Sequence, residues 1–291
     1  MAALLRGGLV AEALSKELTP RIAKLETAGI TPTLAIVRVG ERDSDLSYER
    51  GAIKCCKGLG LGLKRFVLPA DCTQEELMAV IDTVNADTGI HGCLMLRPLP
   101  MHLDESAACA RLNSEKDVDG ITQGSLYGVF ANQQVGFPPC TADACMQILK
   151  RYECELTGAN VVVLGRSLVV GKPVSMMLQA ANATVTMCHT RTKGLAAKCA
   201  SADILVVAVG RPCMVGADFV RKGQIVIDVG INWDEDAGKL RGDVDFDVVE
   251  PLVAGITPVP GGVGNVTTAI LASHVVEAAE RTQGKFHRIN Q

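Results

Sequence analysis

The sequence predicts a two-domain α/β protein built on parallel β-sheets. The chain has 291 residues, enough for two domains of about 150 residues each. Hydrophobic residues make up 48% of it and aromatic residues only 3%, which suits strands buried on both faces better than an all-β sandwich. Apolar strand-like runs also alternate with helical segments along the whole chain, a pattern typical of βαβ units.

The first half contains three apolar runs with helical segments between them. The segment 73–85 opens with T-x-E-E, the capping-box pattern of a helix start. The predicted strands here are 33–40, 63–68 and 91–96, and the predicted helices are 43–59, 73–85 and 104–112.

A second α/β set follows a proline-rich segment. Residues 136–141 (GFPPCT) predict a linker, because two prolines exclude a continuous helix or strand. After the linker we predict helices at 142–152 and 266–279, and strands at 160–164, 184–188, 203–207 and 224–228.

Composition argues against several classes of protein. The net charge of -3 and a pI near 6.0 leave no basic footprint for nucleic acid. The apolar run at the N-terminus is short and interrupted, and no stretch approaches the roughly 20 apolar residues of a membrane span. The eleven cysteines contain no C-x-x-C pair. We therefore expect a cytoplasmic protein with reduced, mostly buried cysteines and no metal site.

The motif VVVLGRSLVVGKP at 161–173 is a candidate phosphate site. An apolar strand runs into a Gly turn and then a helix, so that a phosphate can approach backbone N–H groups at the positive helix end. Ser167 replaces the second glycine of G-x-G-x-x-G, and βα turns also use glycine simply for tight packing. Both interpretations stay open from this motif alone.

The end of the next strand bears on cofactor choice. A NAD site usually carries an acid about 20 residues after the Gly turn, but the segment 187–192 (MCHTRT) contains none. Arg166 and Arg191 offer guanidinium groups suited to a 2′-phosphate. This favours NADP over NAD, although Arg191 would look the same in an ordinary solvated loop.

Further glycines follow the later strands, at the edge where an open parallel sheet faces its ligand. They occur in VGRP (209–212), DVGIN (228–232) and TPVPGGVGN (257–265). A simple turn is the alternative for any two of these residues, but it explains the nine-residue cluster 257–265 less well.

Together these motifs resemble the methylenetetrahydrofolate dehydrogenase/cyclohydrolase family over nearly the whole chain. The second half carries GRSLVVGKP, VAVGRP, VIDVGIN, GDVDF and ITPVPGGVG in the family's order and spacing. The first half carries a Tyr-bearing helix, RPLP, KDVDG and PPCT. The resemblance implies a folate-binding lobe of residues 1–140 completed by 268–291, and a Rossmann-like, doubly wound NAD(P)-binding lobe of residues 141–267. It also implies a homodimer.

The resemblance assigns roles to individual residues. Asp119 would accept hydrogen bonds from the pterin, although without the family we would interpret it as a turn residue before Gly120. Tyr48 would border the folate, although a half-buried helix residue is the plain alternative. The remaining folate contacts would be Pro260, Gly261 and Gly262, and the cofactor contacts Gly165, Arg166, Ser167, Thr190 and Ile231.

The sequence departs from the family where hydrolysis is concerned. The family places a catalytic Lys four residues after the Tyr and a Gln before its L-P-L-P segment, but this chain has Ala52 and Leu96 there. Lys54 is the nearest lysine, and at about 100° per residue it lies about 240° round the helix from Tyr48. We therefore expect a strong dehydrogenase with a weak cyclohydrolase; the alternative is a fully bifunctional enzyme with Lys54 as catalytic lysine.

Two other kinds of protein remain as alternatives. One is a two-domain dehydrogenase of similar build that acts on an amino or hydroxy acid. The other is a folate- or nucleotide-binding protein without catalysis. KDVDG and PGGVG argue against the first, and the glycines at every predicted ligand-facing turn argue against the second.

Overall fold

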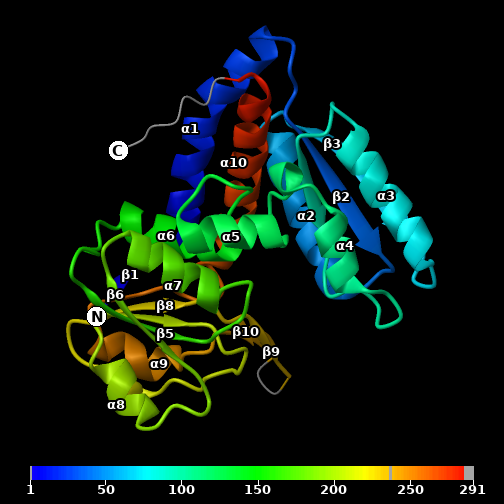
Figure 1. The fold of residues 1–291 in the computed structure, drawn as a ribbon. Coiled ribbons are helices and arrows are strands. Elements are labelled where there is room, and N and C mark those ends of the chain that lie inside the picture. The colour runs from blue at the N-terminus through cyan, green and yellow to red at the C-terminus, as the bar shows by residue number, and fades with distance from the viewer. Residues whose placement is uncertain (1, 236–237, 285–291) are drawn as a thin grey trace. The chain divides into compact units, whose positions relative to one another are not determined.

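The computed structural model describes residues 2–235 and 238–284, and these form two compact units (Figure 1). The large-sheet unit contains the described residues up to Glu12 and Thr141–Thr267. The small-sheet unit contains Ala13–Cys140 and the described residues from Thr268 onward. The family resemblance predicts that the first twelve residues belong to the N-terminal lobe. They group with the large sheet because strand β1 (Ala3–Leu4) pairs with β11 (Gly255–Ile256).

The small-sheet unit is built on three parallel strands in the order β3-β2-β4. They are β3 (Gly62–Leu68), β2 (Thr33–Val39) and β4 (Gly92–Met95), and all three were predicted within a few residues. The helices of this unit are α2 (Asp43–Gly58), α3 (Gln74–Ala86), α4 (Glu105–Arg111) and α5 (Gln123–Ala131), with the short 3₁₀ turn η1 (Ser114–Lys116). Two longer helices, α1 (Gly7–Thr27) and α10 (Gly264–Thr282), have residues in both units.

Alternation along β2 explains how its two faces are covered. Ala35, Val37 and Val39 form one core cluster with Leu77 and Ile81 of α3. The intervening residues include Arg38, whose side chain faces the other way and meets α2. The predicted capping box of α3 is confirmed: the Thr73 hydroxyl accepts from the backbone N–H of Glu76, and the Glu76 carboxylate accepts from that of Thr73.

The large-sheet unit holds six parallel strands in the order β1-β11-β8-β7-β5-β6. From β5 the chain first adds β6 on one side and then crosses to β7 on the other side, which makes a doubly wound sheet whose strand order reverses beside β5. The four predicted strands are confirmed as β5 (Asn160–Leu164), β6 (Thr184–Cys188), β7 (Ile204–Val207) and β8 (Ile225–Asp228). The hairpin β9 (Asn232–Asp234) with β10 (Lys239–Arg241) is separate and antiparallel.

Helices cover both faces of this sheet (Figure 1). Val162 and Leu164 of β5 pack in a cluster with Cys199 of α8 (Leu195–Ala200) and Val249 of α9 (Phe246–Val249). The other face carries α6 (Cys140–Arg151) and α7 (Gly171–Ala180). The 3₁₀ turns η2 (Ala217–Phe219) and η3 (Glu250–Leu252) complete the unit. Among the described residues, no helix is long and apolar enough to cross a membrane.

Candidate active site

The turn between β5 and α7 requires its two glycines for its own packing. Gly165 has a φ of 134°, and a Cβ there would lie 2.2 Å from the carbonyl oxygen of Ala208 after β7. A Cβ on Gly171 would lie 2.3 Å from the carbonyl oxygen of Gly165. The end of β5, the end of β7 and the start of α7 are therefore in direct backbone contact.

The surface of this turn is available to an anion. Arg166 and Ser167 are exposed, and the residue that precedes α7, Val170, provides no side-chain cap for the helix. The Ser167 hydroxyl accepts from the backbone N–H of Val170 at 3.1 Å, which closes the loop on itself. An uncapped helix start with a cation beside it suits a phosphate group.

The loop after β6 presents a hydroxyl and a cation to solvent. The His189 Nδ1 accepts from the backbone N–H of Arg191 at 3.1 Å, and the Thr192 hydroxyl accepts from the backbone N–H of His189 at 2.9 Å. This local turn leaves Thr190 and Arg191 exposed. Since no carboxylate occurs in the segment 187–194, nothing there repels a second phosphate.

The PGGVG segment packs closely against the start of α1. Gly261 has a φ of 110°, and its carbonyl accepts from the backbone N–H of Gly7 at 2.9 Å. A Cβ on Gly262 would lie 2.5 Å from the carbonyl oxygen of Pro258. The chain's own packing therefore accounts for both glycines, while Pro260 is exposed.

Most of KDVDG holds its own loop. The Lys116 ammonium donates to the carbonyls of Val84, Asn85 and Asp87, and so caps the C-terminus of α3. The buried Asp117 carboxylate accepts from the backbone N–H groups of Ile121 at 3.0 Å and Thr122 at 2.7 Å. Gly120 has a φ of 66°, and a Cβ there would lie 2.3 Å from the backbone nitrogen of Pro139.

Asp119 is the charged member of the motif that does not fix the loop backbone. Its carboxyl is half-buried, and desolvation raises its pKa to about 6, against a smaller lowering effect of a hydrogen bond from the Cys140 thiol. A carboxylate whose pKa lies this close to neutrality changes its charge within the ordinary range of enzyme assays.

Helix α2 carries Tyr48 and Lys54 on different sides. Tyr48 is half-buried, Ala52 is fully buried and Lys54 is exposed. The helix is unbroken from Asp43 to Gly58, so no distortion turns Lys54 toward the Tyr48 side. Leu96, the other departure from the family, is buried as well, with an exposed fraction of 5%.

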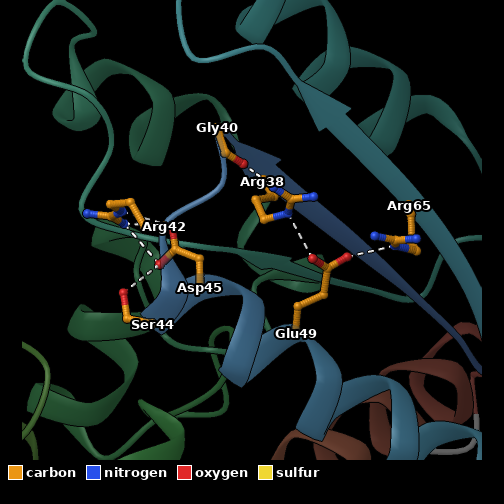
Figure 2. Close-up of polar contacts among 7 residues, drawn as sticks. All are labelled: Arg38, Gly40, Arg42, Ser44, Asp45, Glu49 and Arg65. Atoms are coloured by element: carbon orange, nitrogen blue, oxygen red, sulfur yellow. Dashed lines mark hydrogen bonds and ion pairs between the residues drawn. The ribbon is translucent and has the colours of Figure 1, made fainter.

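A buried ion cluster fixes the same helix to the sheet (Figure 2). The Glu49 carboxylate accepts from Arg38 Nε at 2.8 Å through one oxygen and from Arg65 Nε at 2.6 Å through the other. Arg38 also donates to the carbonyl of Gly40, at the end of β2. One turn earlier, Asp45 accepts from the Arg42 guanidinium through both of its oxygens.

This cluster holds one turn of α2 in register with β2 and β3. The side chains of Arg38 and Glu49 are only 5% and 3% exposed, so neither charge is well solvated without the other. Removing one partner of such a buried pair typically costs about 3–5 kcal/mol. Tyr48 lies next to Glu49 in the chain, and the cluster therefore fixes its helical turn too.

The predicted site residues thus fall into two groups, one in each unit. The small-sheet unit contains Tyr48, Lys54 and Asp119. The large-sheet unit gathers the others in the segments that follow β5, β6, β8 and β11. Of these, Ile231 is 58% exposed, directly after the turn that ends β8. Sequence reasoning missed the Glu49 cluster and the structural roles of Lys116 and Asp117.

The two units match the two models of one protein family. Residues 5–119 match the tetrahydrofolate dehydrogenase/cyclohydrolase catalytic domain, and residues 139–283 match the NAD(P)-binding domain of the same family. A curated relative from Carboxydothermus hydrogenoformans, "Bifunctional protein FolD", is 54% identical over 98% of this chain and 99% of its own length. One from Clostridioides difficile with the same name is 49% identical over 97% of this chain and 98% of its own length.

Solved structures of similar fold come from the same kind of enzyme. The bifunctional FolD enzyme of Campylobacter jejuni is 38% identical, covers 97% of this chain and 100% of its own, and gives a TM-score of 0.94. The Trypanosoma brucei methylenetetrahydrofolate dehydrogenase-cyclohydrolase, complexed with NADP and an inhibitor, is 35% identical over 97% of this chain and 98% of its own, with a TM-score of 0.92. The large-sheet unit is therefore a Rossmann-like NAD(P)-binding domain. The chain belongs to the tetrahydrofolate dehydrogenase/cyclohydrolase family.

Proposed function

We propose that the protein oxidises 5,10-methylenetetrahydrofolate to 5,10-methenyltetrahydrofolate with NADP and then hydrolyses the product. The observation that carries the proposal is the exposed, uncapped turn of Arg166 and Ser167, beside the point where the order of a doubly wound sheet reverses. In a member of this family, that is where a dinucleotide is expected to lie.

For the oxidation, the protein has to position the folate and the dinucleotide, and it does not have to transfer a proton. A bound dinucleotide would supply the hydride acceptor. The C–H bond of the methylene bridge would break as the lone pair of the folate nitrogen forms the new C=N bond. The turn at Gly165 would hold the dinucleotide, and Asp119 would orient the pterin by accepting hydrogen bonds from two of its N–H groups. Holding two reactants in a productive geometry contributes roughly several kcal/mol to such a step.

We infer NADP rather than NAD from the charges near the adenosine end. Arg166, Thr190 and Arg191 are exposed, and the segment after β6 contains no acid to bind ribose hydroxyls. Guanidinium groups bind phosphate through two parallel hydrogen bonds. The NADP complex of the T. brucei relative supports the same choice.

Replacing Arg166 by Ala tests this inference. We expect the KM for NADP to rise at least tenfold with little change in the KM for NAD, because only NADP carries the 2′-phosphate. Initial-rate kinetics with both dinucleotides measure it. Lys198→Ala removes an exposed cation from α8 of the same unit and controls for net charge. Equal effects of Arg166→Ala on both cofactors would contradict the assignment.

Replacing Asp119 by Ala tests the folate site. A hydrogen bond to a charged group is worth about 1.5–3 kcal/mol, so kcat/KM for the folate should fall at least tenfold while the melting temperature stays unchanged.

Because Asp119 has a pKa raised to about 6, the wild-type kcat/KM should also fall as pH drops below about 6, when the carboxyl becomes protonated and loses its acceptor role. The variant should lack this step.

The exposed Glu115 of the same loop provides the control as Glu115→Ala, which should keep the wild-type profile. Lost thermal stability with unchanged kinetics in Asp119→Ala would instead mark a purely structural residue.

For the hydrolytic step we propose full bifunctionality with Lys54 as the catalytic lysine. The relatives at 54% and 49% identity are both named bifunctional, which supports this alternative better than our expectation of a weak cyclohydrolase. Water attack on the methenyl carbon needs a group that moves protons. Because α2 is regular, Lys54 would reach the folate only through its flexible four-carbon stem.

Replacing Lys54 by Met decides this assignment. Loss of a positioned acid–base group typically costs about 10²–10⁴ in rate, so methenyltetrahydrofolate hydrolysis should fall by that factor while dehydrogenase activity stays near wild type. Decay of methenyltetrahydrofolate absorbance measures it. Lys57→Met, an exposed lysine one turn further along α2, is the matched control. Robust hydrolysis by Lys54→Met would exclude Lys54.

We also propose a cytoplasmic homodimer, as the family resemblance implies. Strand β3 is an edge strand of seven residues in the three-stranded sheet, and such edges favour pairing with another chain. Light scattering should give twice the chain mass of 30.7 kDa, and a monomer mass would contradict the proposal.

A further inference from the structure

One buried carboxylate, that of Asp243 in the GDVDF motif, joins two strand-end turns of the large-sheet unit. It accepts from the three consecutive backbone N–H groups after β7, those of Val209 at 2.6 Å, Gly210 at 2.9 Å and Arg211 at 2.8 Å. It also accepts from Asn232 Nδ2, at the start of β9, at 2.9 Å. Asp243 is fully buried, so these four donors share one desolvated charge.

Asp243 is itself held in place by a second buried carboxylate. Asp228, the last residue of β8, accepts from the backbone N–H groups of Gly230, Asp243 and Val244, each at 3.0 Å. Two glycines pack their backbone directly against these carboxylates. A Cβ on Gly230 would lie 2.3 Å from the Asp243 carboxylate, and a Cβ on Gly242 would lie 1.8 Å from the Asp228 carboxylate. The segment 242–245 is also hydrogen-bonded through its backbone to Cys213 and Val215.

The turns that Asp243 holds lead directly to the proposed cofactor contacts. The turn at 209–211 follows Ala208, whose carbonyl oxygen lies against Gly165 with no space for a Cβ between them. Asn232 follows Ile231, which is exposed beside the end of β8. A shift of either turn would therefore move a surface on which the dinucleotide is proposed to lie.

We propose that Asp243 is a positioning residue for the dinucleotide: it touches neither substrate nor cofactor, but it fixes the turns after β7 and β8 at the spacing that NADP requires. The proposal rests on the proposed function. The role of Asp243 goes beyond the proposed function because it makes cofactor affinity depend on a buried side chain outside the Gly165 turn. The hydrolytic half-reaction uses no dinucleotide, so that reaction should not depend on Asp243.

Replacing Asp243 by Asn separates these roles in the full-length protein. An amide presents an NH₂ group to a nest of N–H donors, so part of the network must break. We expect NADPH to bind at least tenfold more weakly, and the KM for NADP to rise likewise, while the KM for the folate and the rate of methenyltetrahydrofolate hydrolysis stay within about twofold. Binding can be followed through the fluorescence of Trp233, the single tryptophan of the chain, in β9 next to Asn232.

Asp245→Asn is the matched control, because it makes the same change two residues away in a half-buried carboxylate and should leave NADPH binding unchanged. If Asp243→Asn fails to fold, Asn232→Ala removes the bond between Asp243 and β9, together with the longer bond from Asn232 to the Arg241 carbonyl, and should weaken NADPH binding about threefold or more with hydrolysis intact. Wild-type NADPH affinity in a folded Asp243→Asn variant would overturn the proposal. A wild type that turns over no methylenetetrahydrofolate would overturn the proposed function instead, and the NADPH titration would still test Asp243.

Discussion

Buried backbone N–H groups in the turns that follow parallel strands need hydrogen-bond acceptors. In the large-sheet unit, the carboxylates of Asp228 and Asp243 are these acceptors. Together they accept seven hydrogen bonds, six of them from backbone groups. Without these acceptors, the turns after β7 and β8 would have unsatisfied buried donors at a cost of about 1–3 kcal/mol each. The small-sheet unit uses the same device, with Asp117 and Lys116 holding the KDVDG loop. In both units, charged side chains fix the loops through hydrogen bonds to the backbone, whereas Arg166 is exposed and Asp119 is half-buried.

The regular elements were predictable because burial imposes a period on the sequence. β2 and β5 are apolar runs between glycine or proline residues, and α3 begins with a capping box. Strands β1 and β11 were missed because two residues are too few to show a period, and because their partners are far apart in the sequence, Ala3 with Gly255 and Leu4 with Ile256. Helix α1 was missed because glycines open it and Pro20 lies inside it, and both residue types have low helix propensity. The N-terminal boundary moved for the same reason: a long-range pairing decides it, not local composition.

The site was predictable only in part. Arg166, Ser167, Thr190 and Ile231 were predicted as cofactor contacts, and all four are exposed. Their roles stay predictions. The hydrogen bonds of Lys116 and Asp243 could not be predicted from local sequence, because their partners lie 32 and 34 residues away in the chain. The partners of Asp117 are only four and five residues away, and this local turn was missed. Gly261 and Gly262 were predicted as folate contacts; the chain itself also favours glycine at both positions, through the φ of 110° at Gly261 and the close approach of the Pro258 carbonyl to Gly262. The family motifs therefore contain residues that fix the loops, such as Lys116 and Asp117, beside residues for which we propose ligand contacts.

The central claim, a folate dehydrogenase with a dinucleotide on the large-sheet unit, is tested most directly by one absorbance assay. The wild-type protein is mixed with 5,10-methylenetetrahydrofolate and either NADP or NAD, and reduced dinucleotide is recorded together with methenyltetrahydrofolate. Our account predicts rapid reduction of NADP, with NAD at least tenfold less efficient, a difference of about 1.4 kcal/mol in transition-state binding. Absence of reduction with both dinucleotides would contradict it, and would leave either a dehydrogenase for another substrate or a binding protein without catalysis.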